Sequence, residues 1–127
     1  MKIGDLAKQA GLTAYTIRYY ERIGLLPPAD RHASGIRDYD PKALIWIGFL
    51  QRLKTTGMPL RDMLTYAALR NTGAASIAER HDLLVRHRAS LCARLTDLNA
   101  SLVVLDAKIA SYAAPVERTI SHDHGPQ

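Results

Sequence analysis

The feature that most constrains this fold is a long stretch of chain, from residue 74 to residue 114, without glycine or proline. Ser76 and Glu79 match the S-x-x-E capping box, in which the two side chains satisfy free backbone amides at a helix start. Because glycine and proline are the strong helix breakers, we expect one helix over residues 76–113, about 55 Å long at a rise of about 1.5 Å per residue. No other segment of the chain is long enough to cover such a helix.

One face of this predicted helix is apolar along its length. Alternating steps of four and three residues from Ile77 reach eleven positions, and nine of these are apolar, the exceptions being His81 and Arg88. We call this stripe the helix seam. An exposed seam would be a large hydrophobic patch, so we expect it to pair with a second copy of the chain; the alternative is that the helix folds back on its own N-terminal part. The expected dimer contacts are Leu84, Leu91, Leu95, Leu98, Leu102, Leu105, Ile109 and Tyr112.

Two short helices separated by three residues are expected at the N-terminus. Apolar residues recur at one-sided helical spacing from Ile3 to Ala10, and Gly11 suits the left-handed residue that often ends a helix. Thr13 can cap a second helix over residues 14–24. The spacing is typical of a helix-turn-helix motif.

The second of these helices has one outward face rich in aromatic and guanidinium groups. At about 100° per residue, Ile17 and Tyr20 point toward a core, and four side chains point away from it. Arginine can donate two hydrogen bonds to a phosphate or a guanine edge, and a tyrosine hydroxyl can reach phosphate oxygens, so the face suits a DNA major groove. Its residues are Tyr15, Arg18, Tyr19 and Arg22.

A short hairpin and two further helices are expected next. Ser34 and Gly35 predict a turn between two extended pieces, which would form a wing. Asp40 can cap a third helix, apolar almost all round, and Pro59 can open a fourth that ends at the NTG sequence of residues 71–73. The third helix is therefore the expected centre of a small core.

Three parts are expected along the chain, and the fold class is mostly α. Residues 1–70 would form a winged helix-turn-helix DNA-binding domain, and residues 76–113 the dimerisation helix. Residues 114–127 contain two prolines and few apolar side chains, which predicts a flexible tail.

Positive charge is concentrated in the expected DNA-binding domain. Residues 1–70 hold eleven Lys and Arg against six Asp and Glu, a net charge of +5, and residues 71–127 hold six of each. Basic clusters displace counterions from phosphate backbones, which favours a nucleic-acid partner over the alternative of a solvated basic surface. No apolar run is long enough to cross a bilayer, and no signal peptide is recognisable, so we expect a cytoplasmic protein without a membrane partner.

Enzymatic, metal and redox functions find little support in the sequence. It contains no phosphate-binding glycine loop, no zinc-protease motif and no nucleophile elbow, so we expect no catalytic residue and no cofactor. His122 and His124 in the tail would bind a metal weakly at best, and we expect no metal site. Cys92 is the only cysteine, and we expect it to be a small buried side chain beside the seam and not a sensor.

Three segments together resemble the MerR family of bacterial transcription regulators. They read IGDLAKQAGLTAYTIRYYERIGLLPP, then GIRDY, then FLQRLKTTGMPLRDML, within residues 1–70. The seam from residue 77 to residue 112 resembles the dimerisation helix of that family. The resemblance implies a winged-helix DNA-binding domain and a homodimer joined by an antiparallel coiled coil.

The resemblance also implies a mode of action. Members of the family bind a palindromic promoter element with an overlong spacer, and the activated dimer distorts the DNA so that RNA polymerase can use both promoter boxes. A small-molecule inducer is implied, but the sequence does not identify it. By matching motif positions, the expected DNA contacts are Arg18, Tyr19, Arg37, Tyr39 and Lys54, and we add Thr13 and Thr16 at the start of the second helix.

A second function class stays open at this stage. The chain could be a DNA-architectural or coiled-coil interaction protein that bends DNA without responding to an inducer. Transcription from a cognate promoter would separate the two, because an architectural protein would not switch a gene.

Overall fold

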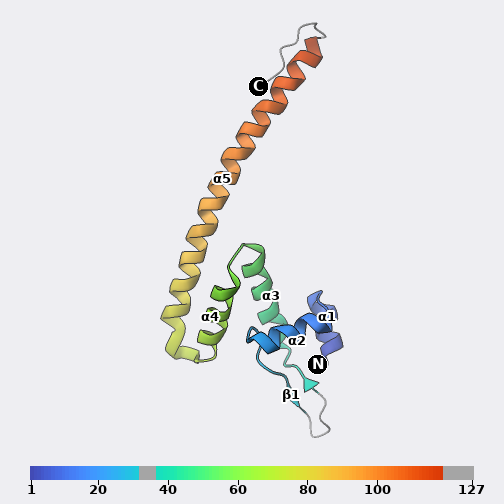
Figure 1. The fold of residues 1–127 in the computed structure, drawn as a ribbon, viewed down its shortest axis with the longest axis vertical. Coiled ribbons are helices and arrows are strands. Elements are labelled where there is room, and N and C mark those ends of the chain that lie inside the picture. The colour runs from blue at the N-terminus through green and yellow to red at the C-terminus, as the bar shows by residue number, and fades with distance from the viewer. Residues whose placement is uncertain (32–36, 119–127) are drawn as a thin grey trace. The chain divides into compact units, whose positions relative to one another are not determined.

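The computed structural model describes the backbone of residues 1–31 and 37–118, and side chains outside residues 30–37 and 114–127 (Figure 1). The chain forms two compact units, of which the first comprises Met1–His87 and the second begins at Arg88. The elements are α1 (Ile3–Ala10), α2 (Ala14–Ile23), β1 (Asp30–Arg31), β2 (Arg37–Asp38), α3 (Lys42–Thr55), α4 (Leu60–Arg70), the 3-10 helix η1 (Gly73–Ser76) and α5 (Ile77–Arg118). This order confirms the mostly α fold with a small wing and a long C-terminal helix.

The predicted helix-turn-helix is present, with both of its caps. Gly11 ends α1 with a φ of 71°, a left-handed conformation that side-chain-bearing residues rarely adopt. The Thr13 hydroxyl accepts a hydrogen bond of 3.1 Å from the amide of Thr16 and so caps α2. The turn holds the two helices against each other, and they pack together in the structure.

Helix α3 supplies the centre of the first unit, as expected. Its start is fixed by Asp40, whose carboxylate accepts a hydrogen bond of 2.9 Å from the amide of Lys42. Its buried residues meet fully buried side chains of α1 and α2, Leu6 and Ile17. The buried residues of α3 are Trp46, Ile47, Leu50 and Leu53.

The first unit extends past the expected domain boundary at residue 70. Leu83 of α5 is buried in the same apolar cluster as α3, which makes the first turns of α5 part of this unit up to His87. Ser76 does not form the predicted capping box. Its buried hydroxyl instead donates to the carbonyl oxygens of Leu69 and Gly73 and accepts a hydrogen bond of 3.0 Å from Arg80, so it fastens the end of α4 to α5.

The long helix continues beyond its predicted end. Helix α5 runs to Arg118, five residues past the expected end at residue 113, and includes Pro115. A proline near a helix end removes a single backbone hydrogen bond, that to the carbonyl four residues before it, and this loss does not stop the helix here. The remainder of the expected tail, residues 119–127, lies outside the described residues. Within the described ranges, no helix combines the length and apolarity needed to span a membrane.

Candidate nucleic-acid interface

The outward face of α2 lies at the surface as the helical spacing predicts. Tyr15 is 71% exposed, and Arg18, Tyr19 and Arg22 are also exposed, whereas Ile17 on the opposite face is buried. The guanidinium of Arg22 lies 5.4 Å from the ring centroid of Tyr19, a cation–π distance. Two guanidinium groups and two phenols therefore lie side by side on one short helix, free to meet a polyanion.

The two threonines at the start of α2 are engaged with each other. The hydroxyls of Thr13 and Thr16 lie 3.0 Å apart, and Thr13 also caps the helix. Thr13 is exposed and Thr16 half-buried. Their shared role in the structure is to fix the N-terminal turn of α2, which carries the exposed Tyr15 between them.

The predicted hairpin is present beside α2. Strands β1 and β2 pair antiparallel, with Asp30 opposite Asp38 and Arg31 opposite Arg37. Arg37 begins β2, but its side chain lies outside the described part of the chain, as does the predicted turn at residues 34–35. The structure therefore confirms the hairpin and leaves the DNA contact of Arg37 a prediction.

Tyr39, which we expected at the DNA-binding surface, is buried instead. Its side chain is 2% exposed, and its hydroxyl donates a short hydrogen bond to the carboxylate of Glu21. Glu21 also accepts a hydrogen bond of 3.3 Å from the amide of Ala29. Tyr39 thus joins the end of the wing to α2 from within the core. The signal available in the sequence was Glu21, the only acid in α2, whose carboxylate can accept a hydrogen bond from a phenol.

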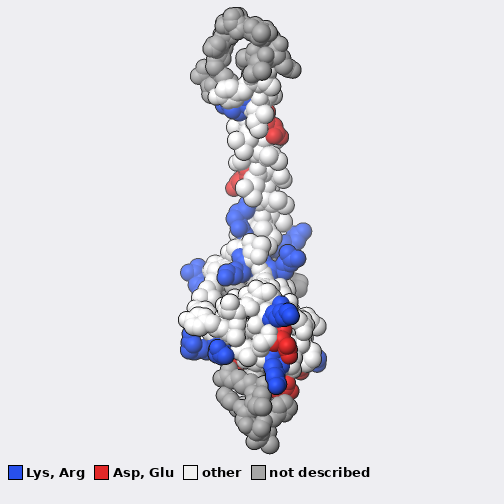
Figure 2. All heavy atoms as spheres, turned by 90° about the vertical axis from the view of Figure 1, so that its right-hand side faces the viewer, with Lys and Arg blue, Asp and Glu red and all other residues white. Residues whose placement is uncertain are grey.

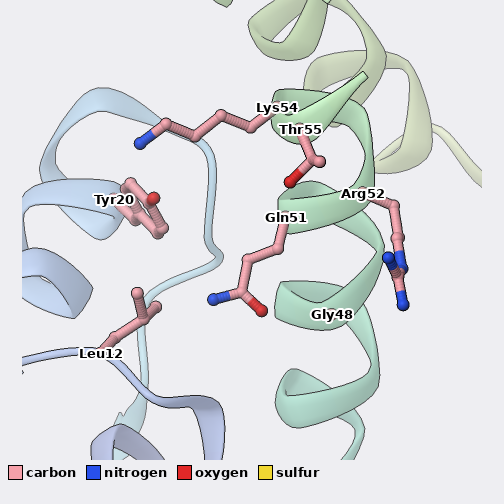
Figure 3. A pocket seen from close by; sticks show the side chains of 7 residues that line it. All are labelled: Leu12, Tyr20, Gly48, Gln51, Arg52, Lys54 and Thr55. Carbon is pink, nitrogen blue, oxygen red and sulfur yellow. The ribbon is translucent and has the colours of Figure 1, made fainter. Parts of the chain in front are cut away.

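Lys54 lies beside a groove between α2 and α3. The groove has a volume of about 530 Å³, and Figure 3 shows the ammonium group of Lys54 reaching from α3 across its mouth toward the α2 side. Gln51 donates a hydrogen bond of 3.2 Å to the carbonyl of Ala10 across the same groove. The residues that line it are Leu12, Tyr20, Gly48, Gln51, Arg52, Lys54 and Thr55.

Arg52 is a further exposed cation that the sequence reasoning missed. It lines the groove, yet in Figure 3 its guanidinium points to the opposite side of α3 from the Lys54 ammonium. Figure 2 shows Lys and Arg side chains spread over the visible face of the first unit, with few acids between them. The positive charge of residues 1–70 is therefore displayed on the surface, where a phosphate backbone can reach it.

The helix seam is exposed in the second unit. Its apolar residues from Leu95 to Tyr112 are each 54–66% exposed. Leu84 differs from them, since it packs against the core of its own first unit, and Leu91 is half-buried. Val103 and Val104, which the seam does not include, are equally exposed. This part of α5 thus presents an unusual amount of apolar surface to solvent.

Cysteine and histidine do not form a recognisable sensor in the described residues. Cys92 is exposed in the single chain, and its burial beside a paired seam stays a prediction. No group of three or more His, Cys, Asp or Glu side chains suited to a metal ion occurs in residues 1–31 and 37–118. His122 and His124 lie outside those residues.

Comparison with known proteins shows which family the chain resembles. The family model described as MerR family regulatory protein matches residues 2–39. The regulator AdhR of Bacillus subtilis is 42% identical over 91 residues, which cover 72% of this chain and 65% of AdhR. An uncharacterized HTH-type transcriptional regulator of Haemophilus influenzae is 36% identical over 106 residues, which cover 84% of this chain and 78% of that protein.

Solved structures share the whole fold. A protein from Listeria monocytogenes assigned to the MerR family superposes with a TM-score of 0.86 at 34% identity, covering 94% of this chain and 90% of that one. HiNmlR, a MerR family regulator lacking the sensor domain and bound to promoter DNA, superposes with a TM-score of 0.79 at 33% identity. That alignment covers 91% of this chain and 92% of HiNmlR.

Proposed function

Because the chain belongs to the MerR family of transcriptional regulators, we propose that it binds a palindromic promoter element as a homodimer and alters transcription by distorting that DNA. Membership in a family of regulators also confirms the expectation that the chain is not an enzyme. The proposal includes an inducer of unidentified chemistry, RNA polymerase as an indirect partner at the promoter, and a cytoplasmic location.

The observation that carries the proposal is the exposed face of α2. Tyr15, Arg18, Tyr19 and Arg22 stand on the second helix of a helix-turn-helix, the element that such proteins lay in the major groove. HiNmlR, which shares this fold, is bound to promoter DNA in its crystal structure. The wing and Lys54 flank the same helix, and we propose that they contact the DNA phosphates beside the major groove.

The dimer is proposed from the exposed seam. An antiparallel pair of α5 helices would bury the apolar residues from Leu95 to Tyr112 and would join two DNA-binding units in one molecule. Two linked units bind a two-part site far more tightly than either alone, because the second contact becomes intramolecular. A palindromic element is the matching partner of a twofold symmetric dimer.

Selection from a pool of random DNA duplexes tests the DNA-binding part of this proposal. We expect the full chain to enrich a palindromic sequence and to protect both halves of it in a footprint. A chain in which Arg18 and Tyr19 are both replaced by alanine is the control and should enrich nothing. Failure of the unaltered chain to enrich any duplex would contradict the proposal.

Transcription separates the regulator from the architectural alternative. The selected element is placed between the two boxes of a promoter, and transcripts are counted with RNA polymerase in the presence and absence of the protein. A regulator changes the transcript yield from this promoter and leaves a promoter without the element unchanged. An architectural protein would bend the DNA when it is present, yet the transcript yield would be the same with and without it.

A further inference from the structure

His87 of α5 forms a side-chain hydrogen bond with Thr56 at the end of α3. The distance between His87 Nε2 and Thr56 Oγ1 is 2.7 Å, and the pair is partly buried. The Thr56 hydroxyl donates to the carbonyl oxygens of Arg52, at 2.7 Å, and Leu53, at 3.2 Å. A hydroxyl and an imidazole nitrogen can each donate or accept, so the hydrogen bond joins Thr56 and His87 whichever of the two supplies the proton.

Thr56 directly follows α3 and belongs to the turn at the end of that helix, two residues after Lys54. The Thr56 amide donates to the carbonyl of Arg52 at 3.0 Å, and the Gly57 amide donates to the carbonyl of Lys54 at 3.0 Å. Gly57 has a φ of 85°, so the chain leaves α3 sharply at this point. The backbone on both sides of Lys54 is thus held by the same turn that His87 contacts.

His87 joins this turn to the helix that carries the seam. It is the last residue of the first unit, four residues after Leu83, which is buried in the same cluster as Leu53 and Met58. The apolar contacts bring α5 against the end of α3, but such contacts are non-directional. The hydrogen bond adds a direction, because it forms only when the imidazole and the turn have one relative orientation.

We propose that His87 is a positioning residue for DNA binding, which holds the end of α3 so that Lys54 reaches a DNA phosphate. This inference rests on the proposed function, in which Lys54 is a phosphate contact. Without the imidazole the turn loses its directional contact with α5, so the end of α3, and Lys54 with it, is no longer held in one orientation toward the DNA. The electrostatic contribution of Lys54 to DNA binding therefore depends on His87.

The dependence of DNA affinity on salt measures this contribution directly. Each phosphate contact adds about 0.9 to the slope of log affinity against log salt concentration, so Lys54→Ala should lower the slope by about one unit. With a random-sequence DNA duplex as the probe, we expect His87→Ala to lower the slope by a similar amount. The double variant should lose no more than Lys54→Ala alone, since both changes remove one contact. His87→Gln, whose amide can also donate or accept a hydrogen bond near the same place, should keep the original slope.

Three results would overturn the inference. An unchanged slope for His87→Ala beside a reduced slope for Lys54→Ala would leave Lys54 as a DNA contact and remove only His87. A double variant that loses about two units would show that the residues act independently. An unchanged slope for Lys54→Ala would contradict the Lys54 contact of the proposed function as well.

A second pair of variants covers the case in which His87→Ala does not fold, as judged by circular dichroism. Thr56→Val removes the hydroxyl at nearly constant shape, whereas Thr56→Ser keeps it. We expect the valine variant to lose about one unit of slope and the serine variant to lose none. Equal slopes for the two would overturn the inference.

Discussion

Tyr39 shows how one buried side chain determines where a DNA-binding surface ends. Its hydroxyl donates to Glu21 in α2, and its own amide donates to the carbonyl of Met1 at 2.7 Å. The residue therefore connects α2, the wing and the N-terminal end of the chain. Exposed Tyr19 has the same chemistry but faces solvent. Burial, not residue type, thus decides which tyrosine is available to a phosphate.

The first prediction separates these two tyrosines. Tyr39→Phe removes a hydrogen bond to a carboxylate and should lower the free energy of unfolding by about 2 kcal/mol in a urea titration. DNA affinity should not change, because the Tyr39 side chain is buried. Tyr19→Phe is the matched control and should weaken DNA binding with little effect on unfolding. Weaker DNA binding with unchanged stability in Tyr39→Phe would place Tyr39 in the interface.

The second prediction concerns two glycines with different backbone conformations. Gly48 lies within α3, and a Cβ built there meets nothing within 4 Å. Gly48→Ala should raise the free energy of unfolding by about 0.5–1 kcal/mol, because alanine loses less conformational entropy in a helix. Gly11 also has open space but has a φ of 71°, so Gly11→Ala should be destabilising. Urea titrations measure both changes, and a loss of stability in Gly48→Ala would contradict the argument.

At the scale of elements, the sequence predicts features that depend on neighbouring residues, such as helix faces and caps. It does not predict contacts between residues that are far apart in the chain. Helical spacing correctly placed Ile17 in the core and Arg18 at the surface, and local caps at Gly11 and Thr13 were read from residues within one turn. Ser76 matched a local capping motif, yet its hydroxyl bonds to Leu69, seven residues away.

The same distinction between local features and long-range contacts holds for the candidate nucleic-acid interface. The exposed face of α2 was predictable because it depends only on the helical period. The burial of Tyr39 against Glu21 and the contact of Thr56 with His87 join residues 18 and 31 positions apart. Periodicity within one element contains no information on such pairs, so the structure was needed to find them.

The third prediction belongs to α2 as a recognition helix. Arg18 stands in the middle of its exposed face, where we expect it to read a base edge, whereas Lys54 beside the groove contacts a phosphate. Arg18→Ala should weaken binding to a selected duplex by about 1–3 kcal/mol and bring it closer to that of a random duplex. Lys54→Ala should weaken both duplexes alike. Competition titrations measure the ratio of affinities, and an unchanged ratio in Arg18→Ala would make Arg18 a phosphate contact.

At the scale of the whole molecule, charge and apolar surface are divided between the two ends of the sequence. The net charge of +5 lies in residues 1–70, and no charged residue occurs between Asp97 and Asp106 in α5. The basic part favours a polyanion, and the apolar part favours another apolar helix. A regulator that holds two basic units on one DNA molecule needs both properties in the same chain.

The fourth prediction tests which face of α5 forms the dimer. Leu98 and Leu102 lie in the seam, and Val103 and Val104, though 68% and 67% exposed, lie outside it. The double variant Leu98→Asp, Leu102→Asp should sediment as a monomer, because pairing would bury two carboxylates of each chain in an apolar contact. It should also bind the selected palindrome much more weakly, since the two DNA-binding units are then no longer linked. The double variant Val103→Asp, Val104→Asp adds the same charge on the outer face and should remain a dimer. An intact dimer in the first variant, or dissociation of the second, would place the contact on the opposite face of the helix.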